Sequence, residues 1–186
     1  DKIIPTDDIE KALEYKRRDS NIVLIGERHG VKLPGFDFGN SPSQIENISF
    51  KGKTIVHTTS AGTKGIMNAK NSEEILTGSL VNAKAIVEYI KLKNPEEVSL
   101  VCMGLDALKE TEEDNLCACY IKSLLEGKNV DIKKEISELK NTSGAKFFDE
   151  RLQEVFPTLD FYLSTELNKF DFVLKYNNGC IKKIEM

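Results

Sequence analysis

Tryptophan is absent from this chain, and histidine and cysteine are scarce. The 186 residues contain two histidines, His29 and His57, and four cysteines at positions 102, 117, 119 and 180. The cysteines show no repeated pair spacing, and two histidines are too few to complete a recognisable zinc set with them. We therefore expect free, mostly buried thiols and no zinc or redox centre.

Basic residues do not outnumber acidic ones: 26 Lys and Arg against 30 Asp and Glu give a net charge of −4. Nucleic-acid and membrane-surface binding both favour a basic excess, so neither partner is expected. The longest apolar stretches, 22–26 and 98–105, are far shorter than the roughly 18 residues of a membrane-spanning helix, and no leader-like segment opens the chain. The composition predicts one cytoplasmic domain over residues 1–186 with a small-molecule partner, and leaves a homo-oligomer open.

Strand-like apolar runs alternate with segments of helical period, which is typical of a layered α/β sheet. Predicted strands cover residues 3–4, 21–26, 53–57, 73–77 and 97–103, and a C-terminal hairpin joins 172–176 to 180–184 around an Asn-Asn-Gly turn. The predicted helices begin with one that runs to residue 18 from a capping box at Asp7 and Glu10. Further helices are expected near 63–69, at 80–93 after a Ser79 cap, at about 112–126, and as two or three short helices within 131–168 with caps at Ser143 and Thr158.

A long stretch after the second predicted strand, residues 27–50, contains several glycines and prolines and is expected to be irregular. Arg28 suits bidentate binding of a phosphate or carboxylate, and Glu27 or Asp37 could hold a hard cation. The alternative is a structured loop anchored by aromatic side chains, with Glu27 and Arg28 paired to each other. The density of polar groups favours a functional loop.

Small hydroxylated residues follow the third predicted strand, over residues 58–65. Backbone N–H groups around Gly62, the helix dipole and Lys64 would form a cradle for an anion. The segment is not a Walker A loop, because it lacks the first glycine and the Gly-Lys-Ser/Thr ending. The alternative is an ordinary helix start capped by Ser60 or Thr63.

An acidic run, Glu112, Glu113 and Asp114, opens the predicted helix after residue 110, and Asp106 precedes it. Mg²⁺ takes one or two carboxylates and keeps waters that a phosphate can displace, so these side chains would suit it. The alternative is a solvated helix start, where acids are favoured by the dipole in any case.

Taken in chain order, these segments resemble the 2-phosphosulfolactate phosphatases. The resemblance spans nearly the whole chain and rests on 26–30 (GERHG), 34–42 (PGFDFGNSP), 58–63 (TTSAGT), 78–83 (GSLVNA) and 113–118 (EDNLCA). It implies a three-layer α/β/α fold with a mixed, mostly parallel central sheet. It also implies Mg²⁺-dependent hydrolysis of the phosphate monoester of a small sulfonated or carboxylated hydroxy acid, such as 2-phosphosulfolactate, a step associated with coenzyme M synthesis.

Two departures from the family pattern accompany the resemblance. Family members carry, ahead of the part that begins here, a strand ending in Asp and an Arg-Ala pair, so we expect the domain to be short at its amino end. Lys64 stands where relatives often have Gln or Arg, and we expect it to keep a phosphate contact.

Residue type and position then suggest three sets of site residues. The catalytic set is Glu27, Arg28 and Asp37. The phosphate-binding set is Asn40, Ser41, Thr59, Ser60, Gly62, Thr63 and Lys64. The metal-binding set is Asp37, Glu113 and Asp114.

In this interpretation Arg28, Lys64 and backbone N–H groups hold the phosphoryl group, and Glu27 positions or deprotonates water. Whether a covalent phospho-enzyme forms is left open, with Asp37 as its nucleophile in that case. The alternative function is a non-catalytic anion-binding protein on the same scaffold.

Overall fold

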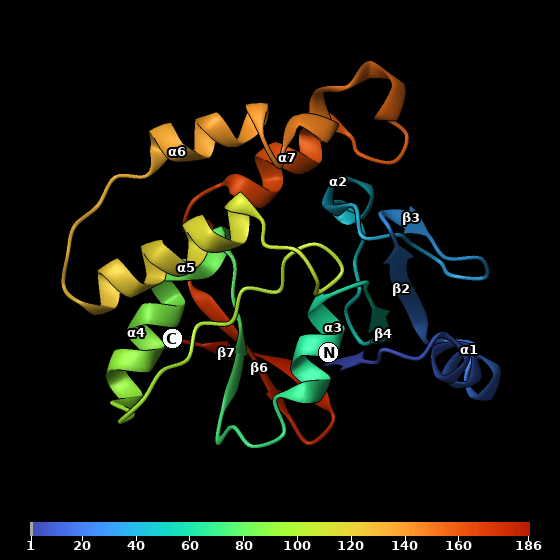
Figure 1. The fold of residues 1–186 in the computed structure, drawn as a ribbon. Coiled ribbons are helices and arrows are strands. Elements are labelled where there is room, and N and C mark those ends of the chain that lie inside the picture. Colours follow the sequence, from blue (N-terminus) through green and yellow to red (C-terminus); the bar gives the residue numbers. More distant parts are fainter. Residues whose placement is uncertain (1) are drawn as a thin grey trace.

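A computed structural model describes residues 2–186, and its strands form one open sheet of seven in the order β3-β2-β4-β1-β7-β6-β5 (Figure 1). The strands are β1 (Lys2–Pro5), β2 (Val23–Arg28), β3 (Val31–Lys32), β4 (Thr54–Thr58), β5 (Ile75–Thr77), β6 (Phe172–Asn177) and β7 (Cys180–Glu185). The helices are α1 (Ile9–Arg18), α2 (Pro42–Ile45), α3 (Gly62–Asn68), α4 (Ala83–Lys93), α5 (Glu112–Leu125), α6 (Lys133–Glu138) and α7 (Thr158–Thr165). Short 3₁₀ turns lie at Leu80–Asn82, Leu139–Asn141, Ala145–Phe148 and Glu150–Leu152.

The sheet is mixed, and its parallel pairs join β2, β4 and β1. Leu24 of β2 lies opposite Val56 of β4, which in turn lies opposite Ile4 of β1. β3 adds to β2, and β7, β6 and β5 follow β1, all in antiparallel pairs. The predicted α/β class is confirmed, and so is its C-terminal hairpin, where Asn178 and Gly179 adopt the positive φ of 48° and 80° that a two-residue turn requires. The expected mostly parallel pairing is not found, because only the β1–β4 and β2–β4 pairs among the described strands are parallel.

Two apolar clusters hold helices against this sheet. In the first, Leu24 and Val56 are fully buried and pack with Ala12 and Leu13 of α1. In the second, Val173 of β6 packs with residues of α4 and α5. Figure 1 shows α1 at one end of the molecule and α4 with α5 at the other, so the parallel strands lie beside the first cluster and the hairpin beside the second.

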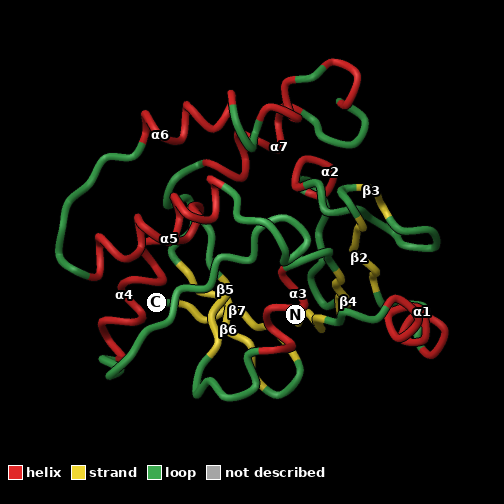
Figure 2. The backbone as a smooth tube through the Cα atoms, viewed as in Figure 1, coloured by secondary structure: helices red, strands yellow, loops and turns green. Residues whose placement is uncertain are grey.

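The predicted strand at 97–103 is wrong. Figure 2 shows the connection between α4 and α5 as loop, and none of the backbone hydrogen bonds described for residues 2–186 involves 97–103. Leu100 packs against the α4–α5 cluster, but Val101 is 75% exposed. Apolar alternation makes an extended chain favourable, whereas a strand also needs a neighbouring strand to bond with, and pattern alone does not supply one.

The helix starts differ from prediction at three of four positions. Asp8, not Asp7, caps α1, because its backbone is extended and its carboxylate accepts a bond from the first turn. Ser79 is a cap as predicted, and it forms a capping box with Asn82 that leads through a 3₁₀ turn into α4. Ser143 caps nothing, since the nearby 3₁₀ turn starts after Gly144. Thr158 is the first residue of α7 and not its cap.

The segment predicted to be wholly irregular begins with a tight hairpin. β2 runs on to Arg28, and β3 returns from Val31 after a two-residue turn. His29 and Gly30 form that turn with φ of 55° and 82°, the backbone that such a turn demands at both central positions. The turn projects the end of β2 toward the loop before α3, where the candidate site lies.

Candidate functional site

The carboxyl ends of the three parallel strands meet at one edge of the sheet, and Arg28 bridges them. Its Nη2 donates to Thr58 Oγ1 at the end of β4 (3.0 Å) and to the carbonyl oxygen of Asp7 after β1 (3.2 Å). Nη1 donates to the carbonyl oxygen of Glu27 at 2.7 Å. Such an edge is where open α/β sheets gather ligands, and the guanidinium is held there by three oxygens.

Glu27 ties the end of β2 to the loop that precedes α3. Its side chain is buried, with 7% exposure for the residue. Oε1 accepts the backbone N–H of Ser60 at 2.7 Å, while Oε2 accepts the N–H of Gly30 at 2.7 Å and the hydroxyl of Ser60 at 3.1 Å. Three donors compensate the carboxylate for its lost water and fix its orientation.

The loop from 59 to 64 is shaped by two threonines that cap each other. The N–H of Thr59 donates to Thr63 Oγ1 at 3.1 Å, and the N–H of Thr63 donates to Thr59 Oγ1 at 3.2 Å. Thr63 is 2% exposed, so it holds the loop from inside. Gly62 and Lys64 face solvent, and no ion pair described within 2–186 involves Lys64. These two remain accessible to an anion.

Asp37 lies at the opposite end of β2 from Arg28. Its Oδ2 accepts the N–H of Leu24 at 2.8 Å and forms an ion pair with Lys16 of α1 at 3.1 Å. Leu24 and Arg28 are four residues apart on one strand, which is about 13 Å at 3.3 Å per residue. The structure thus gives Asp37 an anchoring contact with α1 and does not bring it to the Arg28 edge.

Asn40 and Ser41 lie at the start of α2, beside α7. Ser41 is buried and its hydroxyl contacts that of Ser43 at 3.2 Å, while Asn40 is exposed. The N–H of Ser43 donates to Asp160 of α7 at 2.9 Å, and Asp160 is only 3% exposed. Sequence reasoning missed Asp160, because nothing in the pattern near position 160 indicates a partner 117 residues away.

Glu113 and Asp114 open α5, and their carboxylates are used differently. Asp114 Oδ2 accepts the N–H of Gly104 at 2.6 Å. Glu113 Oε2 and Thr111 Oγ1 are buried and have no hydrogen-bond partner among the described residues. Hard cations such as Mg²⁺ prefer oxygen ligands, and these two oxygen atoms at the start of α5 are of that kind.

His29 and Asp106 link the α5 side to the Glu27 edge. His29 Nδ1 lies 3.3 Å from Asp106 Oδ2, and the backbone N–H of His29 donates to Ser60 Oγ at 3.1 Å. Both residues have positive φ, 55° and 56°. The ring of Phe156 lies over Gly30, where a side-chain carbon would come within 2.4 Å of it. The sequence singled out Asp106 only as a neighbour of the acidic run 112–114, and nothing in it indicated the contact with His29 or the position of Phe156 over Gly30.

Away from the start of α5, we consider whether the described residues could form a metal site or a reactive thiol. Within residues 2–186, no three His, Cys, Asp or Glu side chains gather where they could share a metal ion. All four cysteines are free, but the expected burial is wrong, because two are exposed and two are partly buried. Burial, followed by the charge of Asp114, raises the pKa of the partly buried Cys117 to about 12. Burial also lowers the pKa of His57, which contacts the carbonyl oxygen of Ile25 at 3.2 Å.

No helix among residues 2–186 has the length and apolar character to cross a bilayer.

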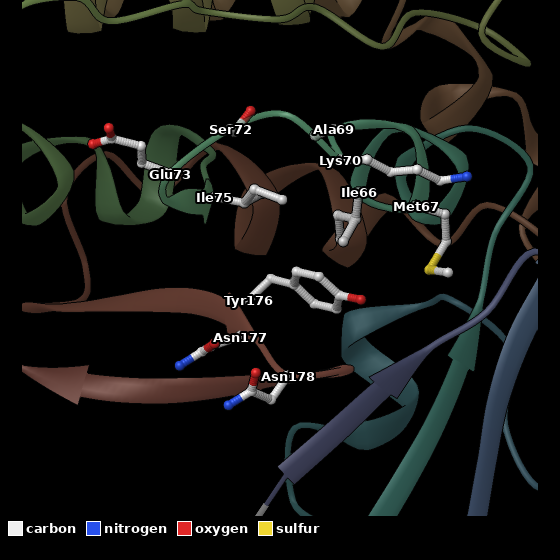
Figure 3. Close-up of a pocket in the computed structure, with 10 residues that line it drawn as sticks. All are labelled: Ile66, Met67, Ala69, Lys70, Ser72, Glu73, Ile75, Tyr176, Asn177 and Asn178. Carbon is white, nitrogen blue, oxygen red and sulfur yellow. The ribbon is translucent and has the colours of Figure 1, made fainter.

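A separate cavity of about 340 Å³ opens between α3, the connection to β5 and the C-terminal hairpin (Figure 3). Tyr176 lies below Ile66 and Ile75 in this view, and Asn177 and Asn178 flank the opening. Lys70, near the other end of α3 from Gly62, also lines it. Ile66 and Met67 in the second half of α3 line this cavity, and no predicted site residue does.

A family model described as 2-phosphosulpholactate phosphatase matches residues 1–179. The chain belongs to the 2-phosphosulpholactate phosphatase family. A relative from Thermoplasma volcanium, named as a probable 2-phosphosulfolactate phosphatase, is 35% identical over 179 residues, which cover 96% of this chain and 80% of the relative. A relative of the same name from Caldicellulosiruptor saccharolyticus is 42% identical over 126 residues, which cover 66% of this chain and 52% of the relative.

The family membership confirms the resemblance drawn from the motifs, and both relatives are named as probable phosphatases. The aligned part is about half the length of the Caldicellulosiruptor relative and four fifths of the Thermoplasma relative. Within the family fold, the structure places Glu27, Arg28 and Ser60 at the ends of neighbouring strands, and Lys64 lies exposed in the first turn of α3. Asp37 and the Asn40–Ser41 pair lie apart from that group.

Proposed function

We propose that this chain hydrolyses the phosphate monoester of a small sulfonated or carboxylated hydroxy acid, such as 2-phosphosulfolactate, with the help of Mg²⁺. One observation carries the proposal: Arg28 and the fixed carboxylate of Glu27 leave the sheet at the carboxyl ends of its parallel strands, beside the exposed start of α3. The names of the relatives support the substrate class.

The phosphoryl group would bind between Arg28 and the start of α3. Arg28 is anchored through Nη1 and Nη2, so its charge is positioned before the substrate arrives. Lys64 and the backbone at Gly62 add positive potential from the exposed side of the loop. Because these charges are already in place, they stabilise the phosphoryl oxygens in the transition state without any rearrangement of the side chains.

Glu27 serves as the base of the site. It is the buried carboxylate at this edge, and its three donors hold it in one orientation. A base fixed in this manner removes a proton from a hydroxyl group or water that lies within hydrogen-bond reach.

For Mg²⁺ we propose the start of α5 in place of the three carboxylates expected from the sequence, because Asp37 is engaged at the other end of β2. Glu113 Oε2 and Thr111 Oγ1 would hold it, with Asp114 adjacent, while Asp37 is engaged with Lys16. When bound, the ion supplies positive charge that neutralises phosphate oxygens. Mg²⁺ usually keeps several waters, so two protein oxygens suffice for this role.

The test is phosphate release by the purified chain from 2-phosphosulfolactate and from 4-nitrophenyl phosphate, with Mg²⁺ and with EDTA. We expect Arg28→Ala to lower kcat/KM by about 10²-fold or more. Arg18→Ala, a matched arginine on the surface of α1, should leave the rate unchanged. Asp37→Asn measures whether the Lys16 contact affects the site at all.

Absence of phosphate release from the unmodified chain would sink the enzyme proposal. The anion-binding alternative predicts instead that phosphate or a sulfonate raises the melting temperature without metal and without turnover. The two outcomes are measured on the same protein preparation, so they separate hydrolysis from simple binding.

A further inference from the structure

The hydroxyl group of Ser60 is hydrogen-bonded to the buried carboxylate of Glu27. Its hydroxyl donates to Glu27 Oε2 at 3.1 Å and accepts the N–H of His29 at 3.1 Å. A serine oxygen has one proton and two lone pairs, so these contacts use the proton and one lone pair. The second lone pair remains for an electrophile, and Ser60 is only half-buried.

The base itself is oriented by the main chain. The N–H groups of Gly30 and Ser60 each donate to Glu27 at 2.7 Å, one to each carboxylate oxygen. A nucleophile in hydrogen-bond contact with a base, and a base held by further groups, is the arrangement by which enzymes activate hydroxyl groups.

The backbone around Ser60 is held by hydrogen bonds, and a lysine follows it four positions later in the chain. The reciprocal bonds of Thr59 and Thr63 lock the loop on its buried side. Lys64 follows in the first turn of α3 and is exposed. A phosphoryl group that reaches Ser60 would therefore meet a preset hydroxyl, with a cation nearby to offset its charge.

We propose that Ser60 is the phosphoryl acceptor of this site and that Glu27 takes its proton. This deepens the proposed function and rests on it. In the first step Ser60 Oγ bonds to phosphorus, the ester P–O bond breaks, and the proton held by Glu27 passes to the leaving alkoxide. In the second step water attacks the phosphoserine, Glu27 accepts a water proton and returns one to Ser60 Oγ, and inorganic phosphate leaves.

The experiment is rapid acid quench of the full chain turning over 4-nitrophenyl phosphate with Mg²⁺, followed by peptide mass spectrometry. We expect a phosphoryl group on the peptide containing Ser60, early in the time course, and none in Ser60→Ala. Ser60→Ala should also lose about 10³-fold or more in kcat while keeping a wild-type circular dichroism spectrum. Ser72→Ala, an exposed serine on the connection to β5, is the matched control and should be labelled at Ser60 as in wild type.

Phosphate release without label at Ser60 in any quenched sample overturns the inference and leaves the phosphatase proposal standing, since water then attacks the ester directly. Ser60→Ala that keeps its activity overturns it in the same way. A chain that neither releases phosphate nor becomes labelled refutes both proposals together. Label on Ser60 with slow release supports the acceptor role and assigns the slow step to hydrolysis of the phosphoserine.

Discussion

Replacing Glu27 with Gln tests whether this carboxylate is the tie between β2 and the loop before α3. The carboxylate accepts one N–H on Oε1, and a second N–H together with a hydroxyl on Oε2. An amide has only one oxygen, so its NH₂ group must face either the N–H of Ser60 or that of Gly30. Whichever way the side chain turns, one buried backbone donor loses its acceptor.

The expected cost follows from that unpaired donor. Leaving one buried polar group unsatisfied costs about 1–3 kcal/mol, and the remaining bonds lose the strength that the charge gave them. We expect Glu27→Gln to lower the free energy of unfolding by about 2 kcal/mol, or the melting temperature by about 4–8 °C for a chain of this length. The measurement is urea unfolding at pH 7, followed by circular dichroism.

Glu73→Gln serves as the control, because Glu73 is exposed and accepts no hydrogen bond described for this structure. Its unfolding free energy should change by less than about 0.5 kcal/mol. An equally small change in Glu27→Gln would refute the reasoning, since it would mean that the three bonds to Glu27 contribute nothing to the fold.

Three further predictions concern the core, an ion pair and the thiols. Leu24→Ala, at a fully buried position of β2, should cost about 2–5 kcal/mol in urea unfolding, and a loss under 1 kcal/mol would contradict close packing against α1. The hydrogen bond from Lys175 lowers the pKa of Glu74. The pair therefore stabilises the fold at pH values above the unfolded pKa of Glu74, and this contribution is lost as the pH falls. In Lys175→Met the free energy of unfolding should fall less steeply between roughly pH 7 and 3, and a slope equal to that of wild type would refute this contribution. Because burial raises the pKa of Cys117 to about 12, iodoacetamide at pH 8 should modify the exposed Cys119 well before Cys117, and equal rates by mass spectrometry would contradict this.

Local sequence signals predicted most elements and part of the site. The Asn-Gly hairpin, the Ser79 cap and the apolar strands 21–26 and 53–57 are confirmed with small shifts at their ends. The signals for these features come from residues within a few positions of one another, so they can be recognised in the sequence alone. Arg28 was recognisable for the same reason, because it follows directly from a buried strand.

The failures concern interactions between distant residues. The segment 97–103 has the alternation of a strand, but strand formation depends on a neighbour, which the described sheet does not place there. Asp37 lies in the same predicted irregular stretch as Glu27, residues 27–50, but its partner is Lys16, 21 residues earlier. The 131–168 region was predicted as helices, and nothing local indicated that Asp160 would anchor α2 or that Phe156 would cover Gly30.

The sequence by itself determined the family, the α/β class and the residue types at the edge of the sheet. Only the tertiary structure decided which of those residues meet. Glu27 and Ser60 are 33 positions apart, and their contact exists because β2 and β4 pair in parallel and end together. Backbone pairing between distant strands sets that register, and no local preference of either segment specifies it.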